Sequence, residues 1–147
     1  MEYPINLKVI DLSPTCINVC IGKFGDNIEN YYIGNGKDLR DIDDSSTNFV
    51  FSFDSFVHMH KDVINSYLGE INRILKKGGH CFIHHSNLVN GNDNNFENVA
   101  GRSNMTINEF ASLANKNNLN VVEQKLIKWD AEGNPDWLHD CLSLVVK

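Results

Sequence analysis

Four of the six histidines in this 147-residue chain lie in two short segments. His58 and His60 form the first pair, and the adjacent His84 and His85 form the second. Imidazole titrates near neutral pH, so such side chains can act as general bases or bind metal ions. We take His58 as the first candidate for a catalytic base and His85 as the second, and a packed or solvated histidine is the alternative for each.

The spacing of the first pair also allows a metal site. His58-x-His60-x-Asp62 resembles the ligand run of metallo-β-lactamase-like hydrolases, to which the second pair could add ligands. Val63 stands where that run has its final histidine. A metal-dependent hydrolase is therefore a minor alternative, and we assign no metal ligand.

The two histidine pairs flank a strand, helix, strand pattern. Residues 49–53 are aromatic and β-branched, which predicts a short strand buried in a parallel sheet. Apolar residues then recur at helical spacing over residues 62–76, and Gly78-Gly79 is expected to end this helix. Residues 81–83 predict a second buried strand. This order requires a right-handed crossover between parallel strands.

Ligands of such sheets bind beyond the carboxyl ends of the strands. Residues 52–60 and 84–87 follow the two predicted strands, so they form the expected functional edge. Both histidine pairs belong to it.

The same stretch resembles a known family. Residues 49–58, FVFSFDSFVH, and 67–79, YLGEINRILKKGG, are similar to the fourth-strand to fifth-strand region of class I S-adenosylmethionine-dependent methyltransferases. The resemblance implies an α/β fold with a Rossmann-like, mostly parallel sheet and a C-terminal antiparallel hairpin. It also implies S-adenosyl-L-methionine as cofactor and a small-molecule methyl acceptor. Ser52, Phe53 and Asp54 would then touch the cofactor.

An acidic residue closes an earlier predicted strand. Residues 7–10 are mostly apolar, Asp11 follows them, and Ser13-Pro14 has the sequence of a helix start. A carboxylate at the tip of a strand can accept hydrogen bonds from two ribose hydroxyls. The resemblance gives this role to Asp11, with Leu12 beside it. The alternative is an acid that only favours the positive end of the following helix.

A glycine-containing turn follows the next predicted strand, residues 31–33. Gly34-Asn35-Gly36 does not fit a dinucleotide fingerprint, because Leu39 occupies the third glycine position. In the resembled family an acid and a small residue recognise adenine here. Asn35 and Gly36 stand at this place, and an amide oxygen can accept the same bond without charge. A tight turn without ligand contacts is the alternative.

The last part of the chain predicts a helix and two strands. Thr106 and Glu109 have the spacing of a capping box, which begins a helix to about residue 116. Residues 121–129 and 141–146 predict antiparallel neighbours. Before them, residues 88–103 are rich in Asn and Gly and are either mobile or a substrate flap. Arg102 in this segment is either solvated or anion-binding.

The family's first strand and its glycine-rich turn have no counterpart here, since six residues before Leu7 cannot contain them. In the family's sheet that strand lies between the strands that end at Asp11 and at Ser52. We therefore expect an N-terminally truncated domain with two exposed strand edges, which alone binds cofactor weakly or not at all. Residues 22–25 or 34–36 would be the glycine-rich loop if this register is wrong.

Three consequences follow for function and partners. The chain is a methyltransferase or the C-terminal part of one, or else a non-catalytic remnant or partner subunit. A second chain that supplies the first strand, or a homo-oligomer, is an expected partner. We also expect the coding sequence upstream, or a neighbouring reading frame, to encode a strand, a G-x-G-type loop and a helix.

Composition limits the remaining classes. The length suits a single domain, residues 1–147, and the net charge of −6 argues against binding nucleic-acid backbones. Four cysteines are expected to be buried free thiols. No signal peptide and no apolar run of about 20 residues is present, so we expect a cytoplasmic protein that does not span a membrane.

Overall fold

The computed structural model describes residues 6–25, 30–88, 101–127 and 140–147. The chain divides into two compact units, residues 1–41 and 42–147, and each is described by itself. That residues 1–147 form a single domain stays a prediction.

Unit 1 contains two parallel strands and one helix. Strand β1 (Lys8–Asp11) pairs with β2 (Asn30–Ile33), and helix α1 (Pro14–Phe24) connects them. The helix begins as predicted, because the Ser13 side chain accepts a hydrogen bond from the backbone N–H of Cys16. The strand-helix-strand order inferred from the sequence is thus confirmed for this unit.

The burial of α1 differs from the prediction. The helical spacing of Ile17, Cys20, Ile21 and Phe24 predicts a buried face. Of these residues only Ile17 is buried, while Ile21 and Phe24 remain 44% and 43% exposed. In the described residues, this unit has a sheet of two strands. A sheet of this width offers little area against which a helix can bury its side chains.

Unit 2 is a four-stranded mixed sheet with two helices. Its elements are β3 (Thr47–Ser52), the 3-10 helix η2 (Phe56–His58), α2 (Lys61–Ile74), β4 (Leu75–Ser86), α3 (Ile107–Lys116), β5 (Asn120–Ile127) and β6 (Asp140–Val146). The strand order is β3-β4-β6-β5. Strands β3 and β4 are parallel, and β6 runs antiparallel to both β4 and β5. The α/β class and the antiparallel pairing of the last two strands are confirmed.

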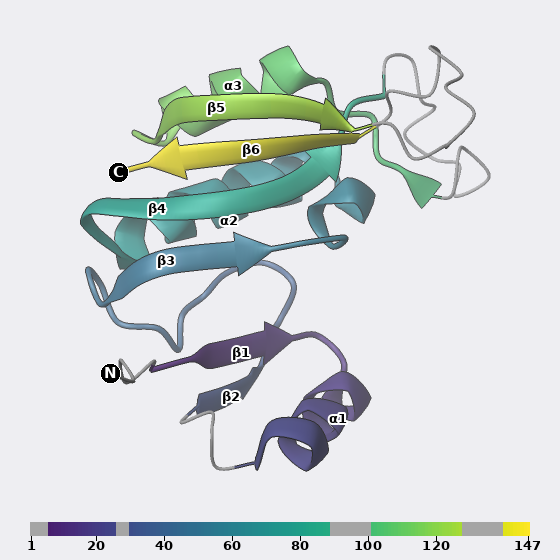
Figure 1. Cartoon of the computed structure of the whole chain (residues 1–147), viewed down its shortest axis with the longest axis vertical. Coiled ribbons are helices and arrows are strands. Elements are labelled where there is room, and N and C mark those ends of the chain that lie inside the picture. The colour runs from purple at the N-terminus through teal and green to yellow at the C-terminus, as the bar shows by residue number, and fades with distance from the viewer. Residues whose placement is uncertain (1–5, 26–29, 89–100, 128–139) are drawn as a thin grey trace. The chain divides into compact units, whose positions relative to one another are not determined.

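Both helices of unit 2 cover the same face of the sheet (Figure 1). The core between them contains fully buried side chains from α2, α3 and the central strands, namely Ile64, Leu68, Ile71, Cys81, Ile83, Phe110, Ala114 and Val145. The capping box is confirmed: Thr106 Oγ1 accepts from the Glu109 N–H, and a Glu109 carboxylate oxygen accepts from the Thr106 N–H.

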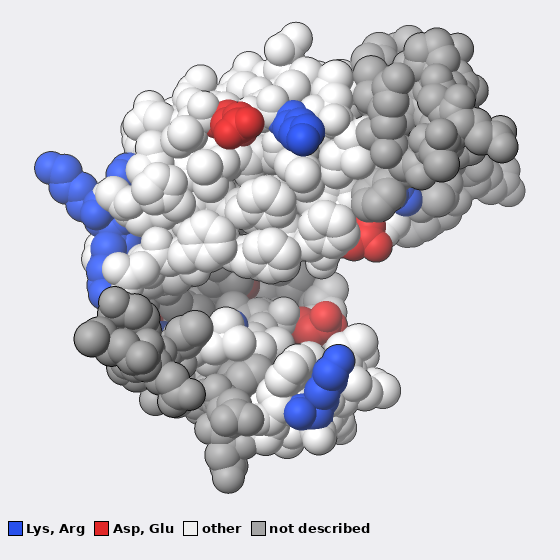
Figure 2. Space-filling view, viewed as in Figure 1, with Lys and Arg blue, Asp and Glu red and all other residues white. Residues whose placement is uncertain are grey.

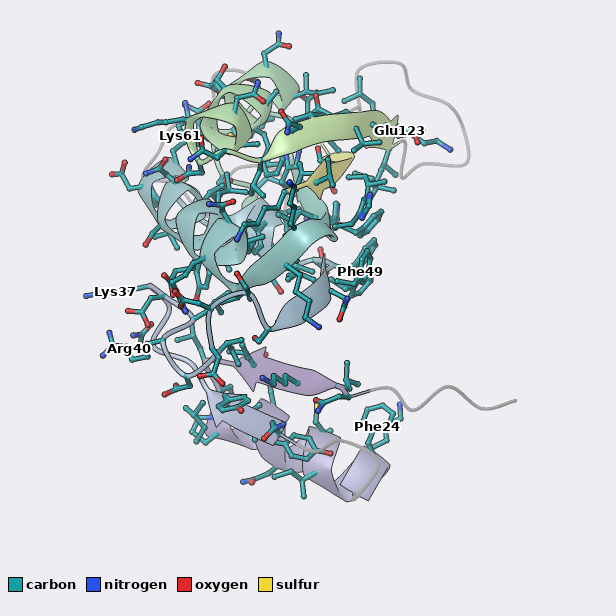
Figure 3. The ribbon with its side chains drawn as sticks, turned by 90° about the vertical axis from the view of Figure 1, so that its left-hand side faces the viewer. Phe24, Lys37, Arg40, Phe49, Lys61 and Glu123 are labelled. Carbon is teal, nitrogen blue, oxygen red and sulfur yellow. The ribbon has the colours of Figure 1, made fainter. Side chains whose placement is uncertain are left out.

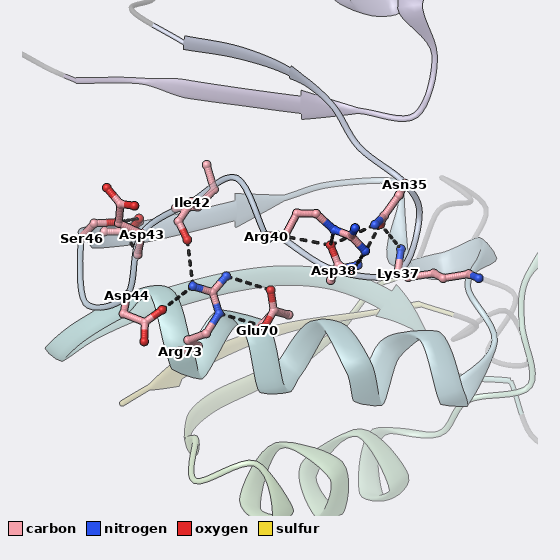
Figure 4. A network of polar contacts seen from close by, with 11 residues as sticks. Asn35, Lys37, Asp38, Arg40, Ile42, Asp43, Asp44, Ser46, Glu70 and Arg73 are labelled. Carbon is pink, nitrogen blue, oxygen red and sulfur yellow. Dashed lines mark hydrogen bonds and ion pairs between the residues drawn. The ribbon is translucent and has the colours of Figure 1, made fainter.

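Helix α2 ends earlier than predicted. It stops at Ile74, and Leu75 is already extended as the first residue of β4. The backbone N–H groups of Ser45 and Ser46 donate to the carbonyls of Arg73 and Ile74, and these tertiary partners replace a further helical turn. Figure 4 shows Arg73 at this end, bound to Glu70, Asp44 and the carbonyl of Ile42.

Strand β3 is not buried as predicted. It lies at the edge of the described sheet of unit 2. Phe49 and Phe51 in this strand are 53% and 65% exposed, and Phe53 just after it is 45% exposed. Figure 3 shows Phe49 on the side of the sheet opposite α2. The Phe51 ring stacks on Phe82 of β4 at 5.5 Å, so the same face continues onto the next strand. Within unit 2, no described helix covers this face.

The four cysteines are free, as expected, but their burial varies. Cys81 and Cys141 are buried, whereas Cys20 is half-buried and Cys16 is exposed. Burial raises the pKa of the Cys81 thiol. None of the described helices is long and apolar enough to cross a membrane.

Candidate functional site

The predicted site residues of unit 1 come together at the carboxyl ends of its strands. Asp11 lies opposite Ile33 in the parallel pair, and its carbonyl accepts a 2.9 Å hydrogen bond from the Gly34 N–H. Gly36 has a φ of 74°, and a Cβ added there would lie 3.2 Å from Leu12 Cδ2. The strand ends thus bring Asp11 and Leu12 beside the turn that contains Gly36.

The Asp11 carboxylate is exposed at this strand end. Its Oδ1 accepts a 2.7 Å hydrogen bond from the Ser13 N–H, which orients the side chain at the start of α1. Within the described residues no hydrogen bond is made by its Oδ2. The carboxylate therefore keeps acceptor capacity on the solvent side.

Asn35 uses its side chain inside the turn. Its Oδ1 accepts from the backbone N–H groups of Lys37 at 2.8 Å and Asp38 at 3.0 Å, and its Nδ2 donates to Asp38 Oδ1 (Figure 4). The Arg40 guanidinium beside Asp38 holds the pKa of that carboxyl well below its usual range. In the structure the Asn35 side chain therefore stabilises a tight turn. Its contact with adenine stays a prediction.

In unit 2, the residues after β3 contact β4. Asp54 has a left-handed backbone with a φ of 59°, and its N–H donates to His84 Nδ1 at 3.1 Å. The ring of Phe53 lies 4.5 Å from that of His84. The segment from Ser52 to Asp54 is thus held at the end of the parallel pair.

His58 is exposed on η2, and its hydrogen bond defines its tautomer. Its Nδ1 lies 2.9 Å from the carbonyl oxygen of Gly101. Because a carbonyl only accepts, Nδ1 carries the proton and Nε2 is the basic nitrogen. A hydrogen bond from one ring nitrogen to a backbone carbonyl is a common way to orient a histidine whose other nitrogen is a base.

The second candidate base occupies a different environment. His85 is fully buried, its ring stacks on Phe110 at 3.9 Å, and its Nε2 lies 2.8 Å from Ser143 Oγ. Burial lowers the pKa of His85 to about 4. Because His85 is buried in this structure, its role as the second candidate base stays a prediction.

The metal alternative gains no support from the geometry. His60 lies at the N-terminal cap of α2, where its side chain makes no capping hydrogen bond. Over the described ranges, no group of three His, Cys, Asp or Glu side chains could hold a metal ion. His58, His60 and Asp62 are therefore not gathered into a site.

Sequence reasoning missed a buried polar cluster beneath Asp54. Asp140, fully buried, accepts two hydrogen bonds from Arg102, at 3.0 and 2.8 Å, and its Oδ2 lies 3.2 Å from His84 Nε2. Arg102 thus binds an internal carboxylate, and 15% of its side chain stays exposed. Residues 89–100 lie outside the described residues, and so do residues 130–136, where Gly133 and Pro135 predict a turn between the last two strands. The three residues are far apart in the sequence, so no local sequence pattern predicts this cluster.

Comparisons with known proteins agree on the fold. The structure resembles a candidate sarcosine dimethylglycine methyltransferase from Galdieria sulphuraria, with a TM-score of 0.75, 16% identity, and coverage of 97% of this chain and 69% of that chain. It also resembles a complex of the Trm112 methyltransferase activator and a candidate methyltransferase from Haloferax volcanii (TM-score 0.70, 22% identity, coverage 96% and 71%). A third is the Burkholderia thailandensis 1,6-didemethyltoxoflavin-N1-methyltransferase, solved with bound 1,6-didemethyltoxoflavin and S-adenosylhomocysteine (TM-score 0.67, 17% identity, coverage 95% and 60%).

Comparison with curated protein sequences finds no match. At identities this low, the structural likeness shows the fold, which is that of class I methyltransferases. The sequence of residues 1–83 matches a family described as a methyltransferase domain. This match covers more than half of the 147 residues, and the chain therefore belongs to the methyltransferase domain family.

Proposed function

We propose that the chain acts in S-adenosylmethionine-dependent methyl transfer to a small molecule, as a methyltransferase or the C-terminal part of one. The observation that carries this is the strand end of unit 1, where the exposed Asp11 carboxylate lies beside Leu12 and the Gly34 turn. A carboxylate at such a strand tip suits the two hydroxyls of a ribose. We assign Asn35 and Gly36 to contacts with adenine. Asn35 Oδ1 already accepts two backbone hydrogen bonds, so we expect its contact with adenine to be weak.

Unit 2 contributes the remaining proposed site residues. Ser52 ends β3, Phe53 and Asp54 follow it, and we assign these three residues to cofactor contacts. His58 is assigned as the base. S-adenosylmethionine supplies an electrophilic methyl group on a sulfonium, and His58 Nε2 accepts the proton that an oxygen or nitrogen nucleophile loses as it takes the methyl. S-adenosylhomocysteine is then released.

The test is an NMR titration of the 147-residue chain with S-adenosylhomocysteine, which measures weak binding directly. We expect shifts at Asp11 and Gly36, and Asp11→Ala should weaken binding roughly 10-fold to 150-fold, the equivalent of about 1.5–3 kcal/mol for a charged hydrogen bond. Asp41→Ala, which removes another exposed carboxylate of unit 1, is the matched control. Equal weakening in both variants, or shifts that avoid these residues, would contradict the ribose assignment.

The base assignment is tested separately. His58→Ala should leave S-adenosylhomocysteine binding unchanged and remove turnover, because the side chain acts on the acceptor. His60→Ala, on a neighbouring exposed histidine, should change neither. A parallel loss of binding and turnover in His58→Ala would show that His58 supports the fold instead.

A partner-subunit function is favoured by the open side of unit 2. Strand β3 has no second neighbour among the described strands, and its phenylalanines are roughly half exposed or more. Few charged side chains lie on this face (Figure 2). An edge strand with exposed apolar side chains is a template for pairing with another chain.

We propose that the occupant is a different chain that adds one strand to β3 and packs a helix on its phenylalanines. Co-expression with the product of a neighbouring reading frame should give a heterodimer in sedimentation, and Phe51→Glu should abolish it. Val19→Glu, at a similarly exposed residue of α1, should not. A dimer of the chain alone that Phe51→Glu dissociates would identify a second copy instead, and no association in either experiment would overturn the proposal.

A further inference from the structure

The turn after β3 has a backbone conformation that needs support. Asp54 has a φ of 59°, in the left-handed region that is unfavourable for most residues with a side chain. Its N–H is satisfied by a ring nitrogen from the neighbouring strand, His84 Nδ1, at 3.1 Å. This hydrogen bond joins residues 30 positions apart, so it ties the turn to the sheet.

The same bond determines how His84 is protonated. An acceptor nitrogen carries no hydrogen, so the proton of the neutral ring must lie on Nε2. That nitrogen faces the buried carboxylate of Asp140, with 3.2 Å between Nε2 and Oδ2, although the N–H direction falls short of hydrogen-bond geometry. A carboxylate at this distance favours the Nε2–H form. The orientation of Asp140 is in turn set by its two bonds from Arg102.

Residues around Arg102 hold the other end of the same turn. The Ser103 N–H donates to the carbonyl of Val57 at 2.7 Å, and the Gly101 carbonyl accepts from His58. The segment between β3 and α2 is thus fixed at Asp54 from β4 and at Val57 and His58 from residues 101–103.

We propose that His84 is a positioning residue, which holds the Asp54 turn in its left-handed conformation by presenting an unprotonated Nδ1, with Asp140 and Arg102 keeping the ring in that tautomer. This inference rests on the proposed function, in which the turn from Ser52 to Asp54 contacts the cofactor. His84 itself is fully buried.

The imidazole ¹⁵N chemical shifts test the tautomer without any ligand, since they separate protonated from unprotonated ring nitrogens. We expect Nε2 of His84 to be protonated and Nδ1 to be unprotonated. A proton on Nδ1 would overturn the proposal, because the Asp54 N–H would then have no acceptor.

Two substitutions separate positioning from general stability. In His84→Asn the amide oxygen can take the place of Nδ1, whereas His84→Gln reaches toward Asp140 and leaves the Nδ1 position without an acceptor. Hydrogen exchange of the Asp54 amide should rise roughly fivefold to tenfold in His84→Gln, as expected for one lost hydrogen bond, and stay near wild type in His84→Asn. His60→Gln, at an exposed position, is the control.

S-adenosylhomocysteine titration of the same variants then links the turn to the cofactor. Affinity should fall several-fold in His84→Gln and be retained in His84→Asn. If wild type shows no binding, the proposed function fails, while the tautomer and the Asp54 exchange still decide the positioning role. Equal Asp54 exchange in both His84 variants would overturn that role.

Discussion

His84 and His85 are adjacent in β4, but their side chains lie on opposite faces of the sheet. His84 contacts Phe53 and Asp54 near the end of β3, while His85 stacks on Phe110 of α3. Successive residues of a strand point to opposite faces, so a pair of neighbouring histidines cannot act together at one site. The sequence pattern placed both at the functional edge, but only the packing of α3 decides that His85 is enclosed.

The buried state of His85 predicts a pH-dependent stability. Its folded pKa of about 4 lies below the ordinary value of 6.5, so the unfolded chain binds more protons between these values. Stability should therefore fall as the pH drops through this window, by up to about 1.4 kcal/mol per pH unit from this group. Urea unfolding at a series of pH values measures the slope.

His85→Gln should remove this part of the slope, and the exposed His60→Gln should leave it intact. An identical pH dependence in His85→Gln and wild type would mean that the pKa of His85 is the same in the folded and the unfolded chain, contrary to its burial.

At the scale of elements, boundaries set by local chemistry were predictable and those set by distant partners were not. Ser13-Pro14 and Thr106 with Glu109 define helix starts through bonds to residues within three positions, and both are confirmed. The end of α2 depends on Ser45 and Ser46, almost thirty residues earlier in the chain, and the prediction there was wrong. Likewise the apolar composition of β3 indicated a strand, but exposure depends on which neighbours it has.

The capping box of α3 gives a prediction at this scale. Thr106→Ala removes the acceptor for the Glu109 N–H, so the free energy of unfolding should fall by about 1 kcal/mol, as is typical for the loss of an N-cap. Urea denaturation at neutral pH measures this change.

Ser112→Ala is the matched control, because its hydroxyl lies inside the same helix, where it bonds to the carbonyl of Asn108. Alanine favours a helix interior more than serine does, so this variant should be neutral or slightly more stable. A loss in Ser112→Ala as large as that in Thr106→Ala would point to the removal of any hydroxyl rather than of the cap.

For the whole molecule, the two units differ in how much they bury. Ile17 is the one buried hydrophobic residue in the described part of unit 1, whereas unit 2 contains a core from α2, α3 and the central strands. Because buried apolar contacts limit local opening, we expect backbone amides of β1 and β2 to exchange much faster than those of β4 and β6.

Hydrogen exchange followed by mass spectrometry tests this difference, with peptides from β1 and β6 compared in one experiment. Saturating S-adenosylhomocysteine should slow exchange at the carboxyl end of β1 if Asp11 binds it. Equal protection of both units in the free chain would show that they unfold as one cooperative body.

Because the thiols differ in burial, a label on one of them can measure how the two units approach each other in solution. Cys16 is exposed on α1, while Cys81 and Cys141 are buried in the sheet of unit 2 and their thiol pKa values are raised. Thiolate is the reactive form, so a maleimide spin label should modify α1 and spare the sheet without prior removal of the buried cysteines. With Cys20→Ser to leave one reactive thiol in unit 1, paramagnetic broadening from Cys16 would report which surfaces of unit 2 approach the label in solution.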